Sequence, residues 1–135
     1  MKLRLKGNSI RLRLGQSEVQ RLATIGAVEE STAFGPSAAH RFLYAVRASS
    51  EEHDGMSASL SGRCLVISIP QTEIHQWAST DQVAIRAVQP TGADTELRIL
   101  IEKDFECIDA PPEESQEDAF PHPQFPLPCV VGKQN

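Results

Sequence analysis

The chain has 135 residues, of which 40% are hydrophobic and 5% aromatic, and its formal net charge is −5 at pH 7. This length is typical of one domain with a real hydrophobic core, so we expect a single domain over residues 1–135. No apolar stretch approaches the roughly 20 residues of a membrane-spanning helix, and the first residues alternate between polar and apolar, which excludes an ordinary secretory signal.

The cysteines indicate the cellular compartment, and the charges indicate how the chain is divided. Cys64, Cys107 and Cys129 form no CxxC pair, a pattern typical of free thiols in a reducing compartment, so we expect a cytoplasmic protein. Residues 1–48 hold eight Lys/Arg against three Asp/Glu. Residues 49–104 hold four against nine, and the remaining residues hold one against six. We expect a body with one basic and one acidic half, followed by an acidic tail.

Two short alternating stretches, Lys2–Lys6 and Ile10–Leu14, open the chain. Alternation with period two predicts two strands, and the Gly7-Asn8 pair between them predicts a tight turn. The apolar side chains of the two strands should share one buried face; they are Leu3, Leu5, Ile10, Leu12 and Leu14.

A short amphipathic helix should follow. Ser17 is the predicted N-cap, with Gln20 at the capping-box position, and Gly26 is a suitable stop. Two more strands are predicted near 28–34 and 41–48.

The second half has the same predicted plan. Strands are expected near 56–61 and 63–69, and Thr72 should cap a second helix that carries Ile74, Trp77 and Ala78 on one stripe. Two further strands, near 82–89 and 96–103, complete this half.

The two halves align without a gap when the chain is shifted by 55 positions. We therefore interpret residues 2–49 and 57–104 as two ββαββ repeats, joined by a polar linker at 50–56. The predicted fold is α+β and mostly β. About eight antiparallel strands and two short helices should form a small barrel or sandwich with a pseudo-twofold axis. The alternative is that two unrelated amphipathic ββαββ stretches simply look alike.

The remaining residues, 105–135, form a different kind of segment. Six of the nine prolines lie there, which argues against a helix or a central strand and predicts an irregular, Pro-rich acidic tail. We expect Phe120 to dock on the body and the chain to be disordered beyond about residue 128.

Several motifs spread over the chain resemble an uncharacterised bacterial domain-of-unknown-function family. The matching motifs are the KGNSIRLRL run at Lys6–Leu14, the strand end at Glu102–Phe105, Cys107 and the pair Phe120-Pro121. His122 departs from the Asn that many members have at this position. The resemblance covers nearly the whole chain and implies no activity.

Residues 61–88 also resemble the swapped-hairpin barrel of transition-state-regulator DNA-binding proteins. This resemblance implies that a duplicated chain forms within one molecule the barrel that those proteins form as a dimer. The half that carries the motif is acidic, which is a departure. The matching residues are Gly62, Arg63, Ile69, Pro70 and Asp81.

The leading functional expectation is a non-catalytic binding or regulatory module that meets a protein partner. Nucleic-acid binding is the first alternative, because alternation places basic side chains in a stripe that would suit phosphates. The sequence pI of about 5.3, the acidic tail and the scarce aromatics argue against it. The same residues could simply face solvent, and the acidic tail could cover them. The candidate residues are Lys2, Arg4, Lys6, Arg11, Arg13 and Arg21.

Metal binding is a further alternative, because Cys107, Asp109 and His122 gather in the tail and Cys and His ligate zinc or copper. Their spacing matches no known finger or ribbon, and a solvated acidic loop explains the same residues. No phosphate-binding glycine loop, HExxH or GxSxG motif is present. We therefore expect neither an enzyme nor a cofactor.

Overall fold

A computed structural model of the protein describes residues 1–51, 55–105 and 118–120. These residues contain eight strands, two α-helices and one short 3₁₀-helix at Ala38–His40. The helices are α1 (Gln16–Thr24) and α2 (Gln71–Ser79). The strands are β1 (Lys2–Lys6), β2 (Ser9–Leu14), β3 (Ala27–Ala33), β4 (Arg41–Ser49), β5 (Ser57–Ser61), β6 (Cys64–Pro70), β7 (Ala84–Pro90) and β8 (Glu96–Lys103). None of the helices in this part of the chain is long and apolar enough to cross a membrane.

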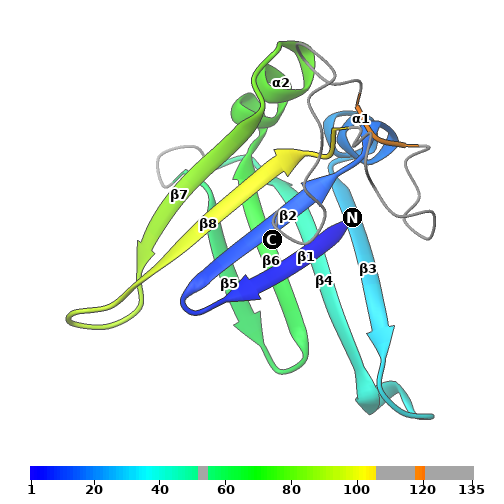
Figure 1. Ribbon diagram of the computed structural model, residues 1–135, viewed down its shortest axis with the longest axis vertical. Coiled ribbons are helices and arrows are strands. Elements are labelled where there is room, and N and C mark those ends of the chain that lie inside the picture. Colours follow the sequence, from blue (N-terminus) through cyan, green and yellow to red (C-terminus); the bar gives the residue numbers. More distant parts are fainter. Residues whose placement is uncertain (52–54, 106–117, 121–135) are drawn as a thin grey trace.

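The strands form two four-stranded sheets. Sheet A has the order β1-β2-β8-β7, and sheet B has the order β3-β4-β6-β5. Each sheet therefore takes one hairpin from each half of the chain, and the strands of the two sheets cross one another (Figure 1). The central pairs, β2 with β8 and β4 with β6, are parallel. The expectation of an all-antiparallel fold is wrong at these two pairs, because local patterns define hairpins but not the direction of pairing between distant strands.

The sheets do not close into a barrel, and their inner faces pack on a shared hydrophobic core as in a sandwich. The inward side chains of β2, β6 and β8 are almost fully buried, as alternation predicts, except for the partly buried Leu97. Leu5 is an exception, with 61% of its surface exposed, because it lies at the hairpin end of β1. The most deeply buried side chains include Leu12, Leu14, Leu22, Val46, Ile67, Ile69, Ile74, Trp77 and Ile101.

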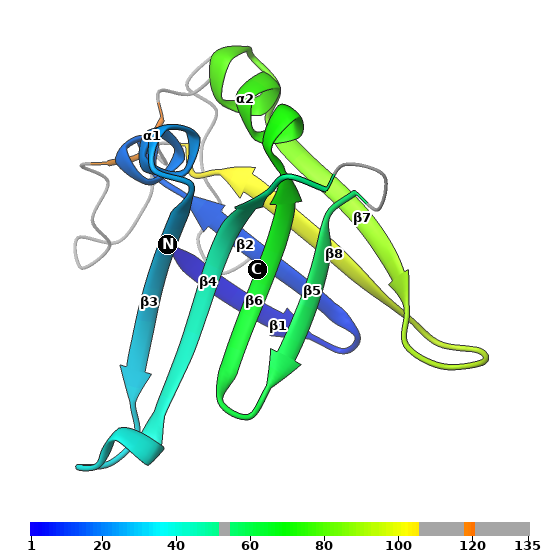
Figure 2. The same ribbon diagram turned by 180° about the vertical axis from the view of Figure 1, so that it is seen from behind.

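Both helices lie together at one end of the sheets (Figures 1 and 2). Helix α1 begins two residues earlier than predicted: its N-cap is Gly15, and the Glu18 carboxylate accepts the Gly15 N–H at 3.0 Å. Ser17 is not the cap. Helix α2 likewise follows directly on Pro70, so Thr72 is not its cap. Gly26 has a φ of +96°, which is the expected conformation just after a helix end.

The strand registers of the two halves correspond closely. Adding 55 to the β1–β2 pair Lys2↔Arg13 gives the β5–β6 pair Ser57↔Ser68. The two parallel pairings correspond in the same way. Adding 55 to Leu43 of β4 gives Arg98 of β8, and subtracting 55 from its partner Cys64 of β6 gives Ser9 of β2, which is the partner of Arg98. The bounds of helix α2 are those of α1 shifted by 55. Strand β7 is shifted by 57 relative to β3. The pair Val28↔Val46, shifted by 55, predicts that residue 83 pairs with Ile101, but Ile101 pairs with Ile85.

The gap-free alignment thus fails at β7. The longer connection from α2 to β7 is compensated by a shorter β7–β8 turn. The pseudo-twofold axis itself stays a prediction. Of the predicted linker, residues 52–54 lie outside the described residues, and Met56 is buried in the core.

The docking of Phe120 is confirmed. Phe120 forms an isolated parallel bridge with Phe105, donates its N–H to the Asp104 carbonyl at 2.6 Å, and is partly buried against the core. The other predictions about the tail fall on residues 106–117 and 121–135, outside the described residues.

Candidate functional site

The outward face of sheet A is strongly basic. Because side chains alternate across a strand, the pairing registers place Lys2, Arg13 and Glu102 in one row across the sheet. The next row holds Arg4 and Arg11, followed by Leu100 and Arg86 from the second half of the chain. We call the following set of seven outward cations the basic face: Lys2, Arg4, Lys6, Arg11, Arg13, Arg86 and Arg98.

Two acidic side chains, Glu96 and Glu102, share this outward side of sheet A. Glu102 lies on the inner strand β8, in the row of Lys2 and Arg13, and is 13% exposed. Its Oε1 atom lies 2.7 Å from Nε of Arg11 and 2.9 Å from Nε of Arg13. At the edge, Lys2 Nζ lies 3.1 Å from Oδ2 of Asp104.

The other four cations, Arg4, Lys6, Arg86 and Arg98, form no ion pair with the residues that the structure describes. Together with Arg11 they line a pocket of about 330 Å³. Its lining includes the apolar side chains of Leu100 and Val88, and Val88 is 57% exposed. The pocket is therefore a positively charged hollow with an apolar floor, which suits a negatively charged ligand.

Five of the six predicted basic residues lie on this face, and the sixth, Arg21, lies on α1, away from it. Arg86 and Arg98 were not predicted, because they belong to the acidic half of the sequence. The alternation of Arg98 with buried Ile99 and Ile101 was a usable signal, but only the sheet order reveals that β8 lies beside β2.

The outward face of sheet B differs sharply. Its pairing registers place only three charged side chains there, Glu29, Arg41 and Arg47. The outward residues of β5 are serines, namely Ser57, Ser59 and Ser61. The basic character is therefore confined to one of the two sheet faces.

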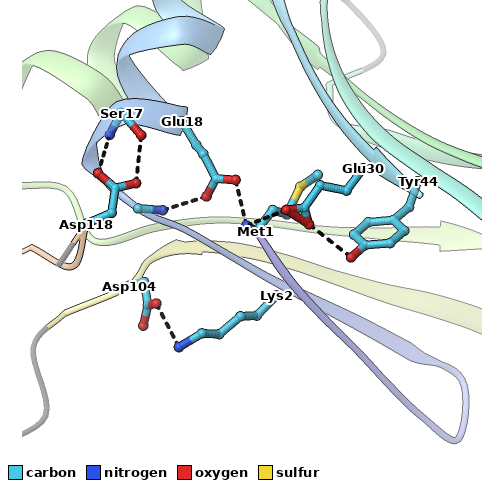
Figure 3. Close-up of polar contacts among 9 residues, drawn as sticks. Met1, Lys2, Ser17, Glu18, Glu30, Tyr44, Asp104 and Asp118 are labelled. Atoms are coloured by element: carbon cyan, nitrogen blue, oxygen red, sulfur yellow. Dashed lines mark hydrogen bonds and ion pairs between the residues drawn. The ribbon is translucent and has the colours of Figure 1, made fainter. Parts of the chain in front are cut away.

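A second polar cluster lies at the start of α1 (Figure 3). The Asp118 carboxylate accepts the N–H of Ser17 at 3.0 Å and its O–H at 2.7 Å, and the Asp118 carbonyl accepts the Gln16 N–H at 2.8 Å. Asp118 therefore satisfies helix N–H groups that a local cap would otherwise serve. Gly15 permits this approach, since a Cβ there would lie 2.7 Å from Asp118 Cγ.

The same cluster extends to the edge of sheet B. The Met1 ammonium lies 2.6 Å from Oε2 of Glu18 and 3.4 Å from Oε1 of Glu30 (Figure 3). The Tyr44 hydroxyl donates to Oε2 of Glu30 at 3.1 Å. Burial, followed by the hydrogen bond and the charge of Glu30, raises the pKa of Tyr44 above its ordinary value.

Lys103 is the one charged residue buried in the described core. Its Nζ donates to the Thr80 carbonyl at 2.8 Å and lies 5.4 Å from the ring centre of Phe120. Burial lowers the pKa of Lys103, while the charge of Asp81 acts in the opposite direction. These contacts give Lys103 a structural role beneath Phe120.

A serine–histidine contact is present among the described residues, with Ser37 Oγ 3.2 Å from His40 Nδ1. The same nitrogen lies 3.4 Å from the Ser37 backbone nitrogen, so the contact closes the 3₁₀ turn. The predicted metal residues Cys107, Asp109 and His122 lie outside the described residues, which themselves contain no group of three metal-ligating side chains.

A family model described as a family of unknown function (DUF7009) matches residues 1–124. The match includes all strands of the basic face and residues 118–120. No curated protein and no solved structure matches the chain.

Proposed function

Since the chain belongs to DUF7009, a family of unknown function, we propose from its own geometry that it is a non-catalytic nucleic-acid-binding module. The outward face of sheet A contacts phosphate groups. The observation that carries the proposal is the gathering of seven cations from both halves of the chain on this face, of which four have no ion pair among the described residues.

Arg86 and Arg98 belong to the half of the sequence that is acidic overall. The acidic second half supplies two of the cations, so the face does not depend on the first half alone. Five of the seven cations are arginines, whose planar guanidinium groups bind phosphate oxygens through two parallel hydrogen bonds. The backbones of neighbouring strands lie ~4.8 Å apart, and alternate residues of one strand lie ~6.8 Å apart along it, so the cations are distributed over an area that suits an extended polyanion.

The residue types on the face indicate what is recognised. The outward residues of sheet A in the described strands include no aromatic side chain. Base stacking on aromatics, which dominates many single-strand binders, therefore has no platform here. We propose contacts to the sugar–phosphate backbone, with little dependence on base sequence.

The decisive experiment measures binding of a labelled random-sequence duplex by fluorescence anisotropy at several salt concentrations. The double substitution Arg4→Gln/Arg86→Gln should weaken binding ~10-fold and lower the salt-dependence slope by about 1.8, because each phosphate contact contributes roughly 0.9 to it. The control is Arg41→Gln/Arg47→Gln, which removes two charges from the outward face of sheet B and should leave both quantities unchanged. Equal losses in both double variants would contradict a site on sheet A.

A protein partner with an acidic segment is the outcome that would replace this proposal. Polyglutamate is the probe for it, because its carboxylates offer a similar charge density without phosphates. Displacement of the duplex by polyglutamate at equal charge concentration would favour an acidic protein and overturn nucleic-acid binding.

A further inference from the structure

Glu102 is an acidic side chain within the basic face, on the inner strand β8 next to Arg13. One of its oxygens, Oε1, accepts a hydrogen bond from Nε of Arg11 at 2.7 Å and from Nε of Arg13 at 2.9 Å. The Arg11 Nη2 atom also lies 2.7 Å from this oxygen. Glu102 is 13% exposed, against 31% for Arg11 and 23% for Arg13, so the carboxylate lies beneath the two guanidinium groups.

The sheet explains why both arginines reach the same atom. Arg11 and Arg13 are alternate residues of β2 and point to the same side, and Glu102 pairs with Arg13 across the parallel β2–β8 ladder. Arg11 and Arg13 carry like charges and repel each other, and the shared carboxylate oxygen offsets this repulsion. Glu102 holds both guanidinium groups in one orientation before any ligand arrives, which reduces the ordering cost of binding.

We infer that Glu102 is a positioning residue that arranges Arg11 and Arg13 as a paired phosphate-binding unit. The inference rests on the proposed function. Each guanidinium has five N–H donors, so an arginine can bond a carboxylate and a phosphate at the same time. Glu102 itself does not touch the ligand in this arrangement, since a carboxylate next to a phosphate would be repelled.

The inference predicts that neutralising Glu102 changes the affinity for a polyanion in the direction opposite to the one that charge alone predicts. Charge alone predicts that neutralising any acid on the basic face tightens binding of a polyanion. Glu96→Gln should follow this rule, because Glu96 lies on the same outward side of β8 and its side chain bonds none of the seven cations among the described residues. Glu102→Gln should weaken binding instead, although it also raises the net charge by one.

The experiment compares these two matched variants with the unmodified chain on the same duplex across a salt series. For Glu102→Gln we expect a ~10-fold higher Kd. The slope of the salt dependence should fall by about one to two, because one or two arginine–phosphate contacts are lost. For Glu96→Gln we expect a tighter Kd. If Glu102→Gln tightens binding as Glu96→Gln does, Glu102 is an ordinary charge and the inference is overturned.

A double-mutant cycle separates positioning from general damage to the fold. In an Arg11→Gln/Arg13→Gln background Glu102 has no guanidinium to arrange, so adding Glu102→Gln should tighten binding. A purely structural role of Glu102 would give the same loss in both backgrounds, which would contradict positioning. Should Glu102→Gln fail to fold, Glu102→Asp keeps the charge, shortens the reach by one methylene and should again lower the slope.

Failure of this inference is distinguishable from failure of the proposed function. If the duplex binds the unmodified chain and Arg4→Gln/Arg86→Gln weakens binding, nucleic-acid binding by the basic face is supported, whatever the effect of substituting Glu102. If the unmodified chain binds no duplex, both are overturned.

Discussion

The pKa of Tyr44 depends on the residues around its hydroxyl group. It is the only tyrosine in the chain, and its hydroxyl donates to Glu30, which also lies 3.4 Å from the Met1 ammonium. Burial disfavours the phenolate, and the neighbouring carboxylate both accepts the phenol proton in a hydrogen bond and repels a second negative charge. These three effects raise the pKa of Tyr44 and outweigh a hydrogen bond with Thr32 that acts in the opposite direction.

We predict that the ultraviolet titration of the folded protein, which reports only Tyr44, gives a midpoint above the ordinary pKa of 10.0. Glu30→Gln should lower the midpoint, whereas Glu29→Gln, on the outward face of the same strand, should leave it unchanged. The unfolded chain loses this proton first, so the contribution of Tyr44 to stability is complete below pH ~10 and is lost as the pH rises through the folded pKa. A midpoint at or below 10.0 would contradict the burial of this hydroxyl.

Helix α1 shows how an element can depend on a distant segment. Its first turn is satisfied by Asp118, which is 101 positions from Ser17 in sequence. Because the cap comes from the far end of the chain, local capping rules placed it wrongly at Ser17. The same docking brings Phe120 within 5.8 Å of Phe105, between ring centres, and next to Lys103.

We predict that Gly15→Ala destabilises the protein by ~1–2 kcal/mol, since a Cβ at this position overlaps Asp118 and expels the cap. Gly15 has an ordinary φ of −76°, so without this contact the substitution would be close to neutral. Urea unfolding followed by the fluorescence of Trp77, the single tryptophan, measures the effect.

Asp118→Ala should cost a similar amount, and the two substitutions combined should cost less than their sum, because both remove the same contact. Full additivity in this pair would show that Gly15 and Asp118 act independently.

At the level of the whole molecule, the two sheets are joined along one edge by Gln89. Its side-chain oxygen accepts the Ala58 N–H and its nitrogen donates to the Ala58 carbonyl, both at 2.8 Å. One β7 side chain thus supplies the paired bonds that a neighbouring strand would supply to β5, where a barrel would otherwise close.

We predict that Gln89→Met destabilises the protein by ~2 kcal/mol, since it leaves the partly buried N–H and carbonyl of Ala58 without these partners. Gln20→Met, at an exposed position of α1, is the matched control and should change the unfolding free energy by less than ~0.5 kcal/mol. Equal effects of the two substitutions in urea unfolding would refute the role of Gln89.

The whole-molecule arrangement also explains which features the sequence could predict. Alternation in Ile10–Leu14 and the stripe of Ile74 and Trp77 were sufficient to locate the strands and helices, because these signals are local. The parallel pairing of β2 with β8 was missed, since it joins residues 89 positions apart, such as Ser9 and Arg98. The basic stripe on β1 and β2 was predicted because these strands form a local hairpin. Its extension to Arg86 was not predicted, because it depends on the distant pairing of β2 with β8.

The two additional residues between α2 and β7 have a consequence for how this fold tolerates change. Ile85 lies inside and Arg86 outside, as Val28 and Glu29 do in β3, because this connection exceeds the α1–β3 connection by an even number of residues. A difference of a single residue would turn Arg86 toward the hydrophobic core and Ile85 toward water. Length variation at this junction should therefore survive only in steps of two.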